Sequence, residues 1–233
     1  MRLHKFLLAA IAILSVAATG AKADIVRFDF QTGAAGTNPD FAAALDTGPG
    51  DTGPGFSGTL DGITFTATAT STMGTTVPNT GSSGFGVNSD VAGDQASSID
   101  PGEILTLTVT FDPAAFSSVQ LANIDLGNVG DPGDGGDVTF PDGSVVTFFD
   151  AATAPAGFEF NAGTDVITVN RDTNPINLDS GDAFVFSTPA GNTDRFRVQR
   201  ISLHLTPAEV VPEPSSLALL GLLGGVVAIR RRR

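Results

Sequence analysis

The segment Glu103–Phe111, which reads Glu-Ile-Leu-Thr-Leu-Thr-Val-Thr-Phe, decides the fold class of this 233-residue chain. Apolar and threonine residues alternate along it, so each kind lies on one face of an extended strand. The apolar set is Leu105, Leu107, Val109 and Phe111, and the threonine set is Thr106, Thr108 and Thr110. We therefore expect a β-strand with one apolar face.

Several other segments have the same character. Val138–Phe140 and Ser144–Phe148 flank Pro141-Asp142-Gly143, which predicts a hairpin. Phe196–Leu205 is expected to close the domain, and a parity shift between Val198 and Ile201 predicts a β-bulge there. The other expected strands are Ile25–Phe30, Ile63–Thr70, Val119–Leu126, Val166–Val169 and Ala183–Ser187. A turn at 179–182 precedes the last of them.

The whole of residues 24–209 is predicted to be all-β, a two-sheet, jelly-roll-like β-sandwich of about eight to twelve short strands. Only Pro39–Leu45 keeps a helical period. Thr32–Gly58, which contains a tandem Asp-Thr-Gly-Pro-Gly, and the polar segment Ser71–Gly84 are expected to be loops. A signal helix and a transmembrane helix are expected to flank the domain.

Residues 1–23 have the features of a signal peptide. Arg2 and Lys5 are basic, Phe6–Val16 is apolar, and Ala21-Lys22-Ala23 is a small-x-small cleavage site. Signal peptidase would then leave Asp24 as the first residue. The alternative is an N-terminal membrane anchor that is kept.

The C-terminal segment 210–233 consists of a short motif, an apolar run and a basic end. The motif is Pro212, Glu213 and Pro214, and the run is Leu217–Ile229. The run spans roughly 20 Å as a helix, against about 30 Å of hydrocarbon, so a buried helix is the alternative to a transmembrane one. The basic end, which marks the cytoplasmic side, is Arg230, Arg231, Arg232 and Arg233.

This order of motif, helix and arginines resembles the PEP-CTERM sorting tail of exported Gram-negative envelope proteins. The resemblance implies that an exosortase-type membrane enzyme processes the tail. It also implies transient anchoring in the inner membrane, a final location in the cell envelope or outside the cell, and extracellular polysaccharide as the surroundings.

Charge and composition exclude several functions. Five basic against 25 acidic residues give residues 24–214 a net charge of −20, which excludes nucleic-acid binding through phosphates. The chain has no cysteine, and both lysines lie within the signal peptide, so thiol, thiolate-metal and Schiff-base chemistry are excluded. Tryptophan and tyrosine are also absent, so a sugar-stacking platform would depend on phenylalanine.

Two acidic clusters are candidate calcium sites, because calcium takes six to eight oxygen ligands. The first follows an expected turn, Gly84-Phe85-Gly86-Val87, and consists of Asp90, Asp94, Asp100 and Glu103. The second lies among glycines and consists of Asp131, Asp134 and Asp137. The alternatives are turn capping for the first cluster and a solvated loop for the second.

Catalytic signals are few, and we predict that the protein is not an enzyme. His204 is the one histidine outside the signal peptide, and it shares parity with Ser202 and Thr206 on a face expected to be solvated. Arg195 and Arg197 are expected to share a face and to offset local acidity. The sequence therefore predicts a structural or adhesive protein of the envelope or extracellular matrix, with no cofactor except possible calcium. The alternatives are a carbohydrate-active hydrolase or a calcium-dependent polysaccharide-binding module.

Overall fold

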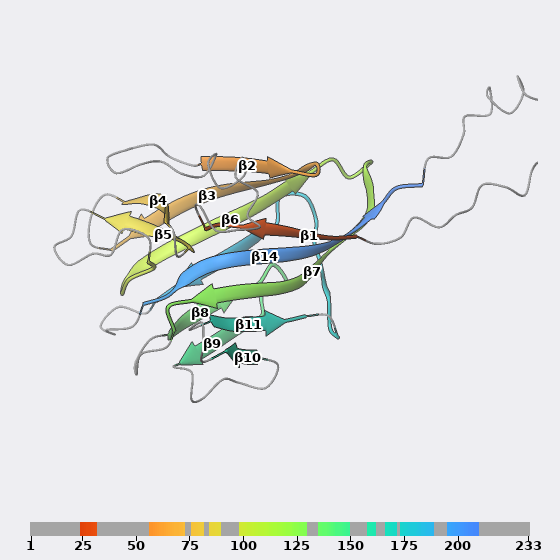
Figure 1. Cartoon of the computed structure of the whole chain (residues 1–233). Coiled ribbons are helices and arrows are strands. Elements are labelled where there is room, and N and C mark those ends of the chain that lie inside the picture. Colours follow the sequence, from red (N-terminus) through yellow and green to blue (C-terminus); the bar gives the residue numbers. More distant parts are fainter. Residues whose placement is uncertain are drawn as a thin grey trace, which may run out of the picture. The chain divides into compact units, whose positions relative to one another are not determined.

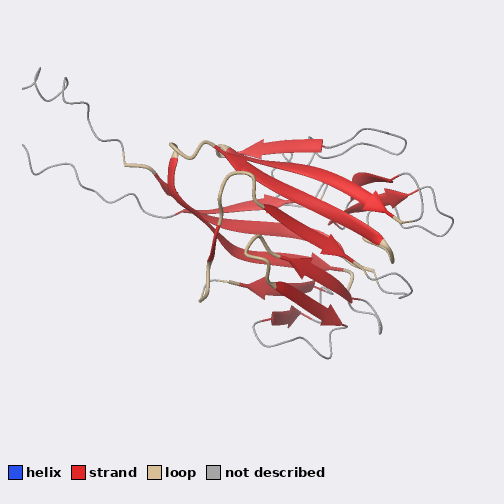
Figure 2. Ribbon diagram, turned by 180° about the vertical axis from the view of Figure 1, so that it is seen from behind, coloured by secondary structure: helices blue, strands red, loops and turns tan. Residues whose placement is uncertain are grey.

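The computed structural model describes residues 24–31, 56–72, 76–81, 84–89, 98–129, 135–149, 158–161, 166–171, 173–188 and 195–209. All regular elements in this part are β-strands (Figures 1 and 2), which confirms the all-β prediction. In these ranges no helix has the length and apolar character needed to cross a membrane. The expected signal helix, the expected transmembrane helix and Pro39–Leu45 lie outside the described residues. Residues Lys22–Pro207 form one compact unit.

One antiparallel sheet has six strands in the order β2-β3-β6-β13-β8-β9. Its centre is the pair of β6 and β13, in which Leu107 lies opposite Phe184. The expected strand Glu103–Phe111 is β6, with both bounds as predicted. The strands are β2 Phe56–Leu60, β3 Ile63–Ser71, β6 Glu103–Phe111, β8 Gly135–Thr139, β9 Val145–Phe149 and β13 Ala183–Ser187.

The other antiparallel sheet has eight strands, with β7 and β14 at its centre (Figure 1). The main order is β10-β11-β7-β14-β5-β4; β1 also pairs with β14, and β12 with β7. The strands are β1 Asp24–Asp29, β4 Thr76–Gly81, β5 Gly84–Ser89, β7 Phe116–Gly127, β10 Phe158–Asn161, β11 Val166–Asn170, β12 Ile176–Asn177 and β14 Arg197–Pro207.

Both sheets contribute their apolar faces to one hydrophobic core. Of the predicted inward residues of β6, Leu105, Leu107 and Val109 are fully buried, and Phe111 is partly buried against the core. Aromatic rings connect the sheets: Phe28 of β1 meets Phe65 of β3 with ring centroids 4.9 Å apart. Such burial of apolar area supplies most of the stability of a chain that has no disulfide.

The predicted bulge in β14 is confirmed. The pairing of β14 with β7 shifts register between Val198 and Arg200, so Gln199 is the extra residue. The carbonyl oxygen of Gln199 accepts a hydrogen bond from the backbone N–H of Phe30 at 2.9 Å, which ties the bulge to the end of β1. The bulge brings both Val198 and Ile201 into the core.

The predicted hairpin between β8 and β9 is also confirmed. The backbone N–H of Phe140 donates to the Ser144 carbonyl at 2.9 Å. Gly143 has a φ of +80°, which glycine adopts without steric cost. A second tight hairpin joins β2 to β3 through Asp61 and Gly62, both with positive φ, in the manner of a type I′ turn.

Three sequence predictions about loops and turns are wrong. Residues 76–81, expected within a loop, form β4, and the expected turn beginning at Gly84 is β5. Phe56–Gly58, expected at the end of a loop, belongs to β2. Backbone hydrogen bonding to a neighbouring strand forms these strands, although glycine, proline and polar residues interrupt their sequences. β4 is an edge strand, which is where a sheet tolerates a proline such as Pro78.

Candidate functional site

The structure describes only some of the predicted site residues. The sorting motif Pro212–Pro214, the arginines Arg230–Arg233 and four of the candidate calcium ligands lie outside the described residues. Those four ligands are Asp90, Asp94, Asp131 and Asp134. The described candidates are Asp100, Glu103 and Asp137.

Asp100 and Glu103 form a capped turn immediately before β6. The backbone N–H of Glu103 donates to the Asp100 carbonyl at 3.0 Å, and the Asp100 N–H donates to the Glu103 carboxylate at 2.9 Å. Between them, Gly102 has a φ of +83°, as the third residue of a type II turn requires. Glu103 is buried, and its carboxylate caps the turn by accepting the hydrogen bond from the Asp100 N–H. The structure therefore supports the turn-capping alternative for this pair.

The second turn of this kind precedes β13, the neighbour of β6. The Asp179 N–H donates to the Asp182 carboxylate at 2.8 Å, and the Asp182 N–H donates to the Asp179 carbonyl at 3.1 Å. This is the turn that the sequence predicted at 179–182. An acidic side chain at the fourth position caps both turns, so this chain uses some of its carboxylates to begin strands.

Asp137 lies on β8, which β13 separates from β6 and its turn in the strand order. Its carboxylate accepts a hydrogen bond from the Thr147 hydroxyl on β9 at 2.6 Å. Within the ranges that the structure describes, no group of three or more histidine or acidic side chains could hold a metal ion. The three described candidates are therefore not brought into one metal-binding group.

A charged row crosses the outer face of the eight-stranded sheet, and sequence reasoning missed it. Arg200 of β14 contacts Asp29 of β1 at 2.6 Å and Asp125 of β7 at 3.2 Å. The Thr168 hydroxyl of β11 donates to Asp125 at 2.7 Å. We call these four residues the carboxylate–arginine row. The side chain of Asp29 is only 6% exposed and that of Asp125 14%, so Arg200 neutralises two carboxylates that are largely removed from water.

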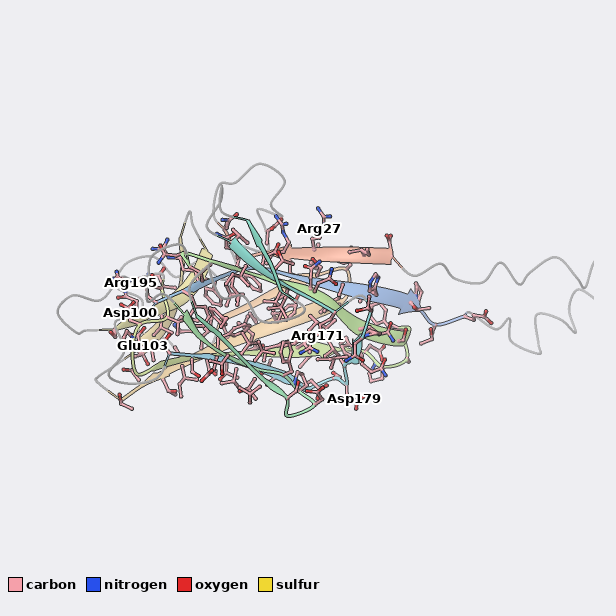
Figure 3. All side chains as sticks on the ribbon, turned by 90° about the horizontal axis from the view of Figure 1, so that it is seen from below. Arg27, Asp100, Glu103, Arg171, Asp179 and Arg195 are labelled. Atoms are coloured by element: carbon pink, nitrogen blue, oxygen red, sulfur yellow. The ribbon has the colours of Figure 1, made fainter. Side chains whose placement is uncertain are left out.

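A second polar row lies beside it on the same sheet. Ser202 of β14 lies opposite Arg27 on one side and Asn123 on the other. Figure 3 shows Arg27 on the outer side of β1, whereas Ser202 is buried. Among the residues that the structure describes, the Ser202 hydroxyl and the Asn123 side-chain carbonyl have no hydrogen-bond partner. The face that carries His204 is therefore only partly solvated, and His204 itself is half-buried.

Arg195 and Arg197 lie near the turn of Asp100. Arg197 is half-buried, and its Nε donates to the Ser98 hydroxyl at 3.1 Å. Burial lowers the pKa of Arg197, and the positive charge of Arg195 lowers it further, while Asp100 opposes the shift. Figure 3 shows Arg195, Asp100 and Glu103 at the same end of the domain, in agreement with arginines that offset local acidity.

Comparison with known proteins identifies one segment of the chain. Residues 210–233 match the family model of the PEP-CTERM protein-sorting motif. No curated protein and no solved structure matches the chain. The match covers the segment in which the sequence showed a Pro-Glu-Pro motif, an apolar run and four arginines. The chain therefore ends in a PEP-CTERM protein-sorting motif, which implies an exported exosortase substrate that is sorted to the cell envelope.

Proposed function

We propose that this protein is a structural or adhesive component of the envelope or extracellular matrix of a Gram-negative bacterium, without enzymatic activity. The observation that carries the proposal is the sorting motif at residues 210–233. The signal peptide of residues 1–23 directs export, and signal peptidase removes it. Leu217–Ile229 then holds the chain in the inner membrane, with Arg230–Arg233 on the cytoplasmic side.

Processing near Pro212-Glu213-Pro214 by an exosortase-type enzyme releases the domain of residues 24–209 into surroundings rich in polysaccharide. A short membrane segment suits an anchor of this temporary kind. The run is shorter than a typical spanning helix, so its hold on the bilayer is weaker than that of a permanent anchor.

The proposed architecture of the domain is a β-sandwich of the jelly-roll type. A jelly roll has eight strands in two four-stranded sheets, in which the first and last strands are neighbours. Here the eight successive strands would be β1, β6, β7, β8, β9, β11, β13 and β14. In support of this, the observed pairings include β1-β14-β7-β11 and β6-β13-β8-β9, the orders 1-8-3-6 and 2-7-4-5 of such a fold. The hairpins β2–β3 and β4–β5 then extend the sheets at their edges.

The use of the described carboxylates supports a structural role. Glu103 and Asp182 cap turns, Asp137 bonds Thr147, and Asp29 and Asp125 neutralise Arg200. A glycosidase needs two carboxylates free to meet substrate about 5 to 10 Å apart. The alternatives, a carbohydrate-active hydrolase or a calcium-dependent polysaccharide-binding module, would therefore draw on other acidic residues.

Substitution of the sorting motif tests the proposal. Pro212→Ala with Pro214→Ala should leave an uncleaved form in the membrane of a strain that has the processing enzyme. Ser215→Ala with Ser216→Ala, next to the motif, is the matched control and should be processed normally. Mass spectrometry and membrane fractionation follow both. A proline variant with the mass and location of the parent protein would contradict the proposal.

A further inference from the structure

The outer face of the six-stranded sheet is composed almost entirely of small and β-branched side chains. We call it the threonine face. Register and alternation with the core place these residues on it: Ser57, Thr59, Thr64, Thr66, Thr68, Thr70, Ile104, Thr106, Thr108, Thr110, Asp137, Thr139, Val145, Thr147, Ala183, Val185 and Ser187.

The side chains of this face form ordered rows across the strands. One row runs from β3 to β9 as Thr68, Thr106, Val185, Thr139 and Val145. β-Branched side chains have restricted χ1 angles, so they lose little conformational freedom when another surface covers them. Cross-strand threonine pairs also stabilise the sheet itself. That stabilisation explains the threonines but does not explain why the face has so few charged residues.

The threonine face differs in charge from the rest of the chain. Asp137 is its one charged residue, and the Thr147 hydroxyl is bonded to that carboxylate at 2.6 Å. Residues 24–214 carry a net charge of −20, from five basic and 25 acidic residues. Two copies of so acidic a chain repel each other in most orientations. Contact through the threonine face places few like charges at the interface, because Asp137 is the one charged residue among those named on it.

Exposed apolar side chains also favour this face. Three large apolar residues are exposed among the described residues, and two of them, Ile104 at 38% and Val145 at 57%, are on the threonine face. The third, Ile25, is at the start of β1 in the other sheet. Covering Ile104 and Val145 would remove apolar area from water, which is favourable.

We propose that a second copy of this chain docks face to face on the threonine face. The six strands have five to nine residues each. With strands about 4.8 Å apart and a rise of about 3.3 Å per residue, the face covers roughly 500 Å². Two copies would bury roughly 1,000 Å² in total, the lower end for a specific interface. The contact is therefore a reversible, concentration-dependent dimer.

Two-fold symmetry fixes the geometry of this dimer. In an isologous interface the same patch of each copy contacts its counterpart, so residues near the axis lie close to themselves in the partner. The centre of the sheet is the pair of β6 and β13, where Thr106 lies opposite Val185. Position 106 is therefore expected to approach position 106 of the second copy.

Cysteine cross-linking of the full-length chain tests the proposal. Because the chain has no cysteine, one introduced thiol is unique. Thr106→Cys should give a dimer with a short bis-maleimide, several-fold faster than Ile25→Cys, an exposed control on the other sheet. The yield should rise with protein concentration. Association through the membrane tail would raise both yields alike, so the ratio of the two reporters isolates the threonine face.

Second-site changes separate docking from folding. Adding Thr66→Lys and Thr108→Lys to Thr106→Cys should reduce cross-linking to the Ile25→Cys level. The introduced lysines of the two copies would then face each other across the interface and repel. Thr66→Val with Thr108→Val, which keeps the shape, should preserve it, and circular dichroism verifies that each variant is folded. Equal yields from the two reporters would overturn the proposal. Protection of the Thr106→Cys thiol from a monofunctional maleimide without dimer formation would also overturn it, since another partner, such as polysaccharide, would then cover the face.

Discussion

Arg200 connects segments of the chain that lie far apart in the sequence. Its guanidinium meets Asp29, 171 residues earlier, and Asp125, 75 residues earlier. Asp29 is nearly buried, and a buried carboxylate without its cation is strongly unfavourable. The carboxylate–arginine row thus holds β1, β14 and β7 together through charge in addition to backbone hydrogen bonds.

Replacement of Arg200 should therefore be costly. Arg200→Met is expected to lower the free energy of unfolding by roughly 3 kcal/mol, because Asp29 and Asp125 lose their shared cation. Arg27→Met is the matched control, since Arg27 is exposed on the outer side of β1, and it should cost less than about 0.5 kcal/mol. Urea unfolding followed by circular dichroism measures both; equal midpoints would contradict the role given to the row.

Asp142 provides a pH-dependent prediction. Hydrogen bonds from the hydroxyl and the backbone N–H of Ser144 lower the pKa of Asp142 below its ordinary 3.8. A lowered pKa in the folded state stabilises the fold above the unfolded value, and this contribution is lost as the pH falls through the folded value. Ser144→Ala should therefore move the pKa of Asp142 back toward 3.8 in an NMR titration. Ser117→Ala should leave it unchanged; the same pKa in all three proteins would refute the assignment.

At the scale of elements, the packing of β8 depends on a glycine. A Cβ at Gly136 would collide with the ring of Phe196 and with the backbone carbonyl of Ser187, neither of which can easily move. A Cβ at Gly127 would meet the side chain of Gln199, which is flexible and only half-buried. Glycine in these strands is thus required to different degrees.

Gly136→Ala is accordingly expected to destabilise the protein by about 1–3 kcal/mol through overpacking. Gly127→Ala should cost less than about 1 kcal/mol, because Gln199 can turn aside. Thermal unfolding of the two variants compares them under identical conditions. A Gly127→Ala variant as unstable as Gly136→Ala would show that Gln199 is held in place.

Elements with regular alternation could be predicted from the sequence, and the others could not. β6 and β13 have the predicted bounds, because every second side chain enters the core. β4 was missed because Thr-Val-Pro-Asn-Thr-Gly lacks that alternation. β5 was missed because the glycines of Gly-Phe-Gly-Val-Asn-Ser indicated a turn, although Phe85 and Val87 alternate and are buried. The hairpin of β2 and β3 did have a local signal, Asp61-Gly62. The carboxylate–arginine row had none, because only the strand order brings Asp29, Asp125 and Arg200 together.

At the scale of the whole molecule, the high negative charge leads to a prediction about calcium. Glu103 and Asp137 are engaged in hydrogen bonds, so we predict a calcium site among acidic residues outside the described part, such as Asp131 and Asp134. Binding at a hundredfold excess over Kd stabilises a fold by roughly 2.7 kcal/mol. Millimolar calcium should therefore raise the Tm by several degrees, and Asp131→Asn with Asp134→Asn should remove the rise. Sodium at matched ionic strength controls for screening, and an equal shift with sodium would exclude a site.

The pairing of β1 with β14 has a consequence for the order of events during translocation. A chain that crosses a membrane from its N-terminus delivers β1 first and β14 last, although Asp24 pairs with Leu205 and Asp29 with Arg200. Since β14 also pairs with β5 and β7, the eight-stranded sheet has no centre until Pro207 has emerged. Until then the earlier strands present unpaired edges, which are prone to aggregation. The sorting tail at residues 210–233 follows immediately. Completion of the fold and presentation of the cleavage motif are thus consecutive steps, and a processing enzyme that acts on the tail meets a substrate whose last strand has just become available.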